Sequence, residues 1–221
     1  MSIPADTDLD VQSLVRDELE WTPEVDAAGI GVAVADGSVT LSGEVGSLGE
    51  RLAAYRAALR VKGVRAVVDN LSVHPKQPWL VTETDVARSV ERALEAASNV
   101  PDSVHATVAG HDVVLRGEVE WDYQRRAAEK AVQYLVGVRS VVNEITLSAR
   151  PSASNAKEMI TWALVRNAQL DARNIRVSVS GTEITLEGTV RSAAERIQAA
   201  QAAWASPHVT HVDNRITVRQ P

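Results

Sequence analysis

The chain has 221 residues, of which 45% are hydrophobic and 24% charged, a composition typical of a folded globular protein rather than a disordered one. It contains no cysteine, which excludes disulfides, thiolate metal sites and a cysteine nucleophile. The net charge of −6 argues against binding to nucleic acid, which requires a basic surface. Neither a long apolar run nor a basic stretch followed by an apolar one occurs, so we expect a cytoplasmic protein without a transmembrane segment.

The first elements along the chain are a helix and a hairpin. Apolar residues at helical spacing predict the helix. They are Val11, Leu14, Val15 and Leu19 and, in a later copy, Met159, Ile160, Ala163 and Leu164. Apolar and small residues then alternate over residues 30–34, which predicts a half-buried strand, and a turn at residues 35–38 leads into a second strand.

A second helix and a third strand complete the pattern. The helix opens with Ser47-x-x-Glu50, a capping box that satisfies free backbone N–H groups. It is predicted to end at Gly63, because glycine is the preferred residue just beyond a helix, and Gly137 has the same place in a second copy. The third strand is expected over residues 67–73.

This succession of elements occurs three times. The segment 39–45 recurs at 113–119 and at 184–190, and each copy contains a glycine that is followed 21 residues later by a valine. The glycines are Gly43, Gly117 and Gly188. Self-similarity of this kind indicates a tandem repeat. We predict repeats over residues 7–74, 82–148 and 154–219, with third strands over 141–147 and 212–218 in the later copies.

The predicted fold class is α+β. Each αββαβ unit is expected to form a small three-stranded mixed sheet with both helices on one face, because three strands cannot bury two faces. A unit of about 65 residues is only marginally stable alone, so contacts between repeats are expected. The shared glycine is assigned to a strand end or bulge. A phosphate-binding loop is not supported, because Gly43-x-x-Gly46-x-x-Gly49 lacks the required spacing and follows a hairpin.

These residues resemble the BON family (bacterial OsmY and nodulation domain). The resemblance rests on the steps Gly43-Glu-Val, Gly117-Glu-Val and Gly188-Thr-Val, the alanines of the second helices and Gly63-Val64-x-x-Val67. The arrangement is similar to that of bacterial proteins with three tandem BON domains, many of them associated with osmotic stress. The resemblance implies a module that binds phospholipid membranes or other hydrophobic ligands, with no catalytic residues.

No catalytic or metal site is predicted. His208-x-x-His211 provides two imidazoles, whereas a metal site needs three or four ligands, and the other repeats have nothing equivalent. No G-x-S-x-G sequence supports a serine nucleophile. We therefore expect no enzyme activity, no cofactor and no metal.

Two groups of aromatic residues are candidates for contacts. Trp79 and Trp162 are expected to be buried between repeats, because neither lies on the apolar stripe of its own unit. Trp121 replaces the capping serine found in the other copies, and Tyr123, Arg125 and Arg126 follow it. Aromatic rings beside two cations suit a lipid headgroup boundary. The alternative is that Trp121 packs on a neighbouring repeat while the arginines pair with nearby carboxylates.

The sequence thus leaves three classes of binding function. The leading hypothesis is a protein that binds phospholipid membrane surfaces or envelope-linked partners in a stress response. The first alternative is a protein-interaction scaffold that forms homo-oligomers without lipid contact, and the second is a sensor of small ligands or ions. Net charges of −5, −3 and +2 for the successive thirds of the chain leave only the last third able to attract anionic headgroups.

Overall fold

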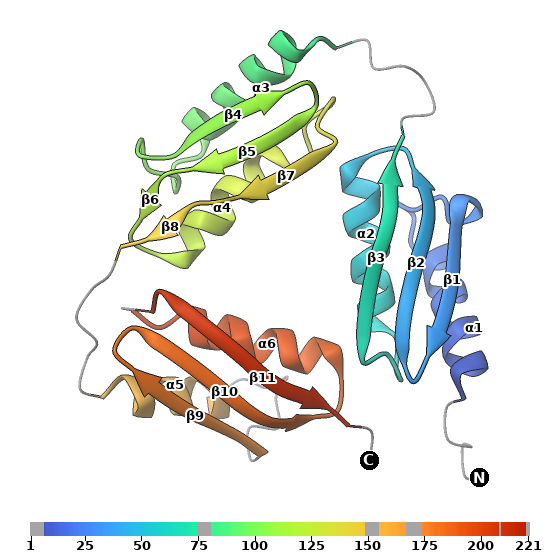
Figure 1. Ribbon diagram of the computed structural model, residues 1–221, viewed down its shortest axis with the longest axis vertical. Coiled ribbons are helices and arrows are strands. Elements are labelled where there is room, and N and C mark those ends of the chain that lie inside the picture. The colour runs from blue at the N-terminus through green and yellow to red at the C-terminus, as the bar shows by residue number, and fades with distance from the viewer. Residues whose placement is uncertain (1–6, 75–80, 149–154, 167–173, 208, 220–221) are drawn as a thin grey trace.

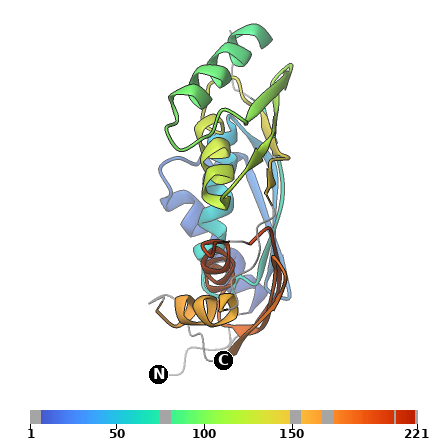
Figure 2. The same cartoon turned by 90° about the vertical axis from the view of Figure 1, so that its left-hand side faces the viewer.

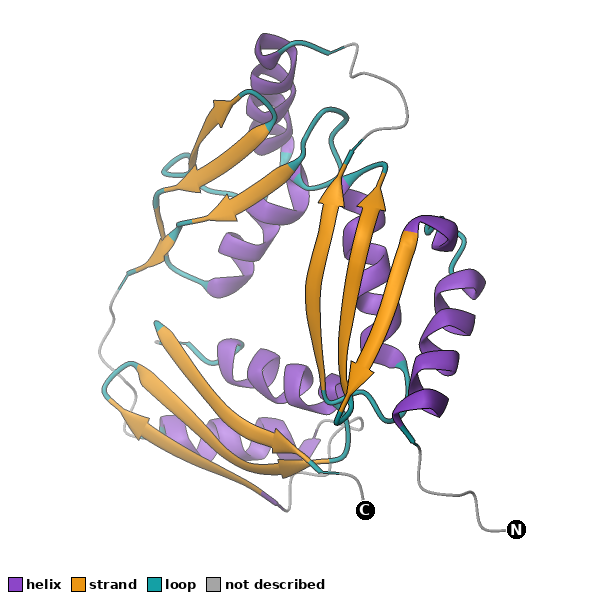
Figure 3. Ribbon diagram, turned by 45° about the vertical axis from the view of Figure 1, so that its right-hand side comes forward, coloured by secondary structure: helices purple, strands orange, loops and turns teal. Residues whose placement is uncertain are grey.

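The computed structural model describes residues 7–74, 81–148, 155–166, 174–207 and 209–219. Three units follow one another along the chain, and each places its helices on one face of a small sheet (Figure 1 and Figure 3). The predicted α+β class and the threefold repeat of a small mixed sheet are therefore confirmed.

The first repeat shows the pattern in its simplest form. Its elements are α1 (Asp8–Trp21), β1 (Ile30–Ala35), β2 (Ser38–Val45), α2 (Leu48–Arg60) and β3 (Ala66–Val73). Strand β2 lies in the centre, antiparallel to β1 and parallel to β3. Its inward residues Val39 and Leu41 are fully buried, together with the stripe of α1 that contains Val11, Val15 and Leu19.

The second repeat has interrupted strands. Its elements are α3 (Glu83–Ala96), β4 (His105–Ala109), β5 (Asp112–Arg116), β6 (Glu118–Val119), α4 (Asp122–Val132), β7 (Ser140–Asn143) and β8 (Thr146–Leu147). The third strand, predicted as continuous over 141–147, is divided into β7 and β8, and a short strand β6 follows β5 beyond the shared Gly117. The backbone pairing nevertheless continues across the break, because the N–H of Thr146 donates to the carbonyl of Gly117 at 2.9 Å.

The third repeat again has long strands. Its elements are α5 (Ala156–Arg166), β9 (Ile175–Ser180), β10 (Glu183–Val190), α6 (Ala193–Trp204) and β11 (His211–Val218). The sheet order is β11-β10-β9, with the same parallel and antiparallel pairings as in the first repeat. Ile160 and Leu164 of α5 face the core, but Met159, which the helical spacing placed beside them, is 48% exposed.

The shared glycine has a steric explanation in all three units. Gly43, Gly117 and Gly188 have φ of +117°, +140° and +136°, which side chains rarely adopt. A Cβ at these positions would lie only 2.1, 2.2 and 1.9 Å from the carbonyl oxygen of a residue just before the preceding strand. Gly63 and Gly137 also have positive φ, but they lie in the turns that follow helices ending at Arg60 and Val132.

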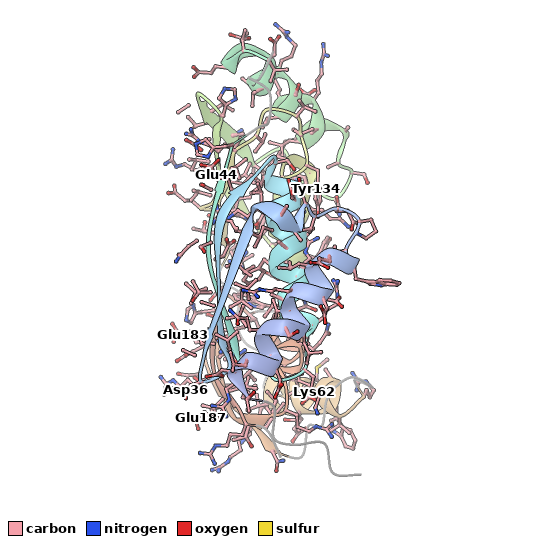
Figure 4. All side chains as sticks on the ribbon, turned by 90° about the vertical axis from the view of Figure 1, so that its right-hand side faces the viewer. Asp36, Glu44, Lys62, Tyr134, Glu183 and Glu187 are labelled. Atoms are coloured by element: carbon pink, nitrogen blue, oxygen red, sulfur yellow. The ribbon has the colours of Figure 1, made fainter. Side chains whose placement is uncertain are left out.

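The repeats meet mainly through their second helices. The first two turns of α2 bring Leu48 into the hydrophobic core of the second repeat and pack Leu52 against it. Nearby, Arg56 donates a 2.7 Å hydrogen bond to the hydroxyl of Tyr134, which lies beside α2 in Figure 4. Helix α2 also contacts α6 of the third repeat. As a result the helices gather on one side of the molecule and the three sheets on the other (Figure 2).

Candidate interaction surfaces

The start of α4 is capped in an unusual way. Trp121 has the extended backbone of an N-cap residue, but its side chain makes no capping hydrogen bond. Gln124 supplies the other half of the capping box, since its Oε1 accepts from the backbone N–H of Trp121 at 3.0 Å and of Glu120 at 3.1 Å. The rings of Trp121 and Tyr123 stack with their centroids 6.4 Å apart.

Asp122 holds both arginines of this helix turn. Its side chain is 2% exposed, Arg125 bonds to Oδ1, and the Nε of Arg126 lies 2.7 Å from Oδ2. The second contact is an ion pair whose N–H is not aligned for a hydrogen bond with Oδ2. The guanidinium of Arg125 also lies over the ring of Trp204 in the third repeat, 4.7 Å from its centroid.

A difference between the repeats explains why Arg125 is available for this contact. At the matching position of the first repeat, Arg51 pairs with Asp69 of β3 at 2.9 Å. In the second repeat Asn143 stands in place of that aspartate, and its amide donates to the backbone carbonyl of Arg125 at 3.1 Å. A neutral amide does not hold the guanidinium, so the Arg125 side chain extends to Asp122 and Trp204.

The four predicted residues of this surface therefore lie together at a contact between repeats. Arg125 is 27% exposed, Arg126 is 48% exposed, and Tyr123 is 53% exposed. The guanidinium groups of Arg125 and Arg126 pair with Asp122, and this pairing weakens their attraction for an anionic headgroup. Lipid binding at Trp121, Tyr123, Arg125 and Arg126 stays a prediction.

The prediction that Trp162 is buried between repeats is wrong. Its side chain, on α5, is 63% exposed. A large apolar side chain off the core stripe need not be covered by a neighbouring repeat, and here it faces outwards. Trp79, the other residue assigned to a repeat interface, lies outside the described residues.

Helix α5 carries a second apolar stripe, which our sequence reading missed. Met159, Trp162 and Val165 are 48%, 63% and 57% exposed. Residues three apart lie on one side of a helix, so the three side chains form one continuous strip. Lys157 and Arg166 are exposed at the two ends of the helix, and neither is seen in an ion pair with a described residue. The three-residue spacing of the strip, beside the core positions 160 and 164, was the available signal.

The stripe is particular to the third repeat. Aligning the buried residues of the first helices places Leu14, Asp17 and Glu20 of α1 at the matching positions. In α3 the matching residues are Ser89, Arg92 and Glu95, all of them exposed. Two charges therefore stand in each of the other repeats where the third has Trp162 and Val165.

Clear pKa shifts belong to structural contacts on the surface. The side chain of Arg139 lowers the pKa of Asp112 below its usual range, and the same contact raises the pKa of Arg139. Hydrogen bonds from capping threonines lower the pKa of Asp10 and Asp85. Among the described residues no three histidine, aspartate or glutamate side chains are grouped so that they could bind a metal ion. No helix in the described ranges has the length and hydropathy to cross a bilayer.

Comparison with solved structures finds, among others, two structures of one protein that are distant from this chain in sequence. The C-terminal domain of CdsD, a structural protein of the type III secretion system of Chlamydia trachomatis, is 14% identical with a TM-score of 0.27, over 96% of this chain and 99% of that one. A second CdsD structure is 13% identical with a TM-score of 0.28, over 96% and 93%. TM-scores this low support no inference about the fold or the function of this chain. A search of curated proteins finds no match.

The comparison with family models gives a match over nearly the whole chain. The BON domain matches three times, at residues 7–75, 82–149 and 152–220. These matches agree with the three sheets, the shared glycines and the αββαβ order of elements. The chain belongs to the BON domain family, as three tandem copies of the domain.

Proposed function

We propose that this chain is a non-enzymatic binding protein that associates with phospholipid membrane surfaces through α5 of its third repeat. The observation that carries the proposal is the exposed strip of Met159, Trp162 and Val165. A helix that presents apolar side chains to solvent and basic side chains beside them can lie in the interface of a bilayer. Membership of a binding-type domain family supports the same conclusion.

The charge distribution agrees with this location. The chain is acidic as a whole, but its last third has a net charge of +2, and Arg166 lies on the same side of α5 as the strip, one turn after Trp162, while Lys157 is exposed near the N-terminal end of the helix. Basic residues near an anionic surface contribute about 1 kcal/mol each, and this attraction is screened by salt. We therefore expect weak binding that is stronger at low ionic strength. A role in osmotic or envelope stress is part of the same proposal.

The proposal is tested by vesicle flotation with the full chain. Vesicles of phosphatidylcholine with and without phosphatidylglycerol are compared at low and high salt. Trp162→Ala is expected to weaken binding about tenfold, because a large apolar side chain that becomes buried in the bilayer contributes about 1.5 kcal/mol or more to the binding free energy. The matched control is Trp21→Ala, since Trp21 is 84% exposed but stands alone at the end of α1 near Glu20 and Glu24.

The earlier hypothesis for the start of α4 is tested in the same assay. Trp121→Ser restores a capping serine, so the melting temperature is expected to stay equal or rise. If the lipid site were at Trp121, this variant would lose vesicle binding while Trp162→Ala would keep it. Equal binding by all three variants and the parent chain would contradict both locations.

A further inference from the structure

A groove lies between helix α3 and strand β4 of the second repeat, remote in sequence from α5. Its volume is about 920 Å³. The apolar part of its lining comes from small and branched side chains, among them Leu94, Val100, Val104 and Val108. Figure 1 shows α3 running alongside β4, which forms the outer edge of its sheet.

The edge of β4 is available for a further strand. Within the described residues β4 pairs with β5 alone, so one side of its backbone has no strand partner. An edge of this kind can bind an extended peptide by adding it to the sheet, with main-chain hydrogen bonds for affinity and side-chain pockets for specificity. The five residues of β4 are enough to pair with a short segment.

The first repeat closes the same edge with one of its own side chains. Gln12 of α1 donates a hydrogen bond of 2.5 Å to the backbone carbonyl of Val32 in β1. Val32 pairs with Leu41 just as Ala106 of β4 pairs with Leu115, so the carbonyl of Ala106 has the equivalent place. No described side chain is seen to donate to it.

The residue that corresponds to Gln12 explains the difference. Gln12 directly follows the first buried valine of α1, and the residue in that place on α3 is Ala87. Ala87 and Ala106 both line the groove. In the second repeat Ala87 thus replaces the glutamine that caps the edge, and Ala106 replaces Val32 of β1. These two truncations leave the groove open at the strand edge.

The charges of the groove favour a cationic occupant. Four carboxylate side chains line it, and Arg88 is the one lysine or arginine among the lining residues. The carboxylates are those of Glu83, Glu91, Glu95 and Asp102. His105 lines the groove as well. Such a rim attracts basic side chains and repels acidic ones, which sets the class of partner.

We infer that the α3/β4 groove of the second repeat binds an extended, basic peptide segment of another protein as an additional strand on β4. The apolar floor takes every second side chain of the segment, and the acidic rim takes the lysines or arginines between them. This binding is independent of the membrane proposal, because it uses a different repeat and the opposite charge.

The test uses a fluorescein-labelled seven-residue peptide of alternating lysine and valine, titrated into the full chain and followed by polarisation. A peptide of alternating glutamate and valine is the control for charge. We expect saturable binding of the basic peptide, at least tenfold weaker binding of the acidic one, and amide shift changes in nitrogen-15 NMR spectra confined to β4, α3 and the 100–104 loop.

Two variants locate the site. Ala87→Gln copies the cap of the first repeat and is expected to weaken binding at least tenfold, whereas the matched exchange Gln12→Ala leaves binding at β4 unchanged. Glu91→Lys reverses a charge on an exposed position, so it weakens binding without disturbing the core, and it decides the matter if Ala87→Gln unfolds the repeat.

Three results would overturn the inference. One is no saturation at peptide concentrations up to about 1 mM. Another is equal binding by the parent chain, Ala87→Gln and Glu91→Lys. The third is an absence of peptide binding together with a molecular mass that rises with protein concentration for the parent chain but not for Ala87→Gln. This would show that the edge pairs with a second copy of the chain instead.

Discussion

Single residues decide how the three copies differ. One matching position in the third strand of each unit holds Asp69 in the first repeat and an asparagine, Asn143 or Asn214, in the others. All three accept a hydrogen bond from the backbone N–H two residues later, so this local contact is kept. Only the aspartate also holds the arginine of the second helix. This exchange lets Arg125 join the second repeat to the third.

The role of Arg125 is tested by comparison with its counterpart in the third repeat. Arg125→Ala leaves the buried Asp122 with one ion-pair partner and removes the contact with Trp204, so we expect the free energy of unfolding to fall by about 2 kcal/mol. Arg196→Ala removes an exposed side chain and is expected to change it by less than about 0.5 kcal/mol. Urea unfolding of both variants measures the difference. Equal effects would contradict the bridging role.

The glycine prediction separates steric contact from backbone strain. Gly188→Ala would place a Cβ 1.9 Å from the carbonyl oxygen of Asn174, and Gly181 has φ of +60° but no heavy atom within 4 Å of such a Cβ. We expect Gly181→Ala to cost about 1 kcal/mol and Gly188→Ala roughly 3 kcal/mol or more. Thermal and urea unfolding provide both values, and similar costs would show that the close approach is not decisive.

At the scale of elements, the sequence predicts the helices, strands and shared glycines because each depends on local signals. Hydrophobic spacing and capping residues act within a few positions of the chain. The side of a helix that faces the core was harder to predict, and Leu14 and Met159 were assigned to core stripes although they are 44% and 48% exposed. An apolar residue next to a core position has the same periodicity whether it faces the sheet or the solvent.

One contact between elements makes stability depend on pH. Asp112 of β5 accepts hydrogen bonds from Arg139 at 3.1 Å and from Ser140 at 2.6 Å, which joins β5 to β7. Because the pKa of Asp112 is lowered in the folded state, the pair contributes stability at pH values above about 3.9, and this contribution is lost as the pH falls through the lowered pKa. Asp112→Asn should therefore destabilise the protein near pH 7.

The measurement is the midpoint of urea unfolding for the parent chain and Asp112→Asn between pH 7 and pH 2.5. We expect the two midpoints to differ near neutral pH and to converge in acid. A matched control is Asp102→Asn, which alters an exposed carboxylate with no described ion pair. A constant difference between parent and Asp112→Asn across the whole range would contradict the account.

At the scale of the whole molecule, the threefold repeat could be predicted and the arrangement of the repeats could not. The repeat is visible in one sequence because three copies share the spacing of the same glycine and valine. The contacts between repeats are made by residues that differ among the copies, such as Leu48, Tyr134 and Trp204. A difference between copies does not by itself show whether a residue contacts another repeat or solvent, so Trp162 was wrongly assigned to an interface.

The most direct test of the central claim is quenching of tryptophan fluorescence by bilayers that contain brominated phospholipids. Two variants are compared, each keeping one of the five tryptophans and carrying phenylalanine at the other four. With anionic vesicles at low salt, we predict strong quenching for the variant that keeps Trp162 and little for the variant that keeps Trp21. Equal quenching of the two, or none for Trp162 when the protein is bound to the vesicles, would contradict membrane binding through α5.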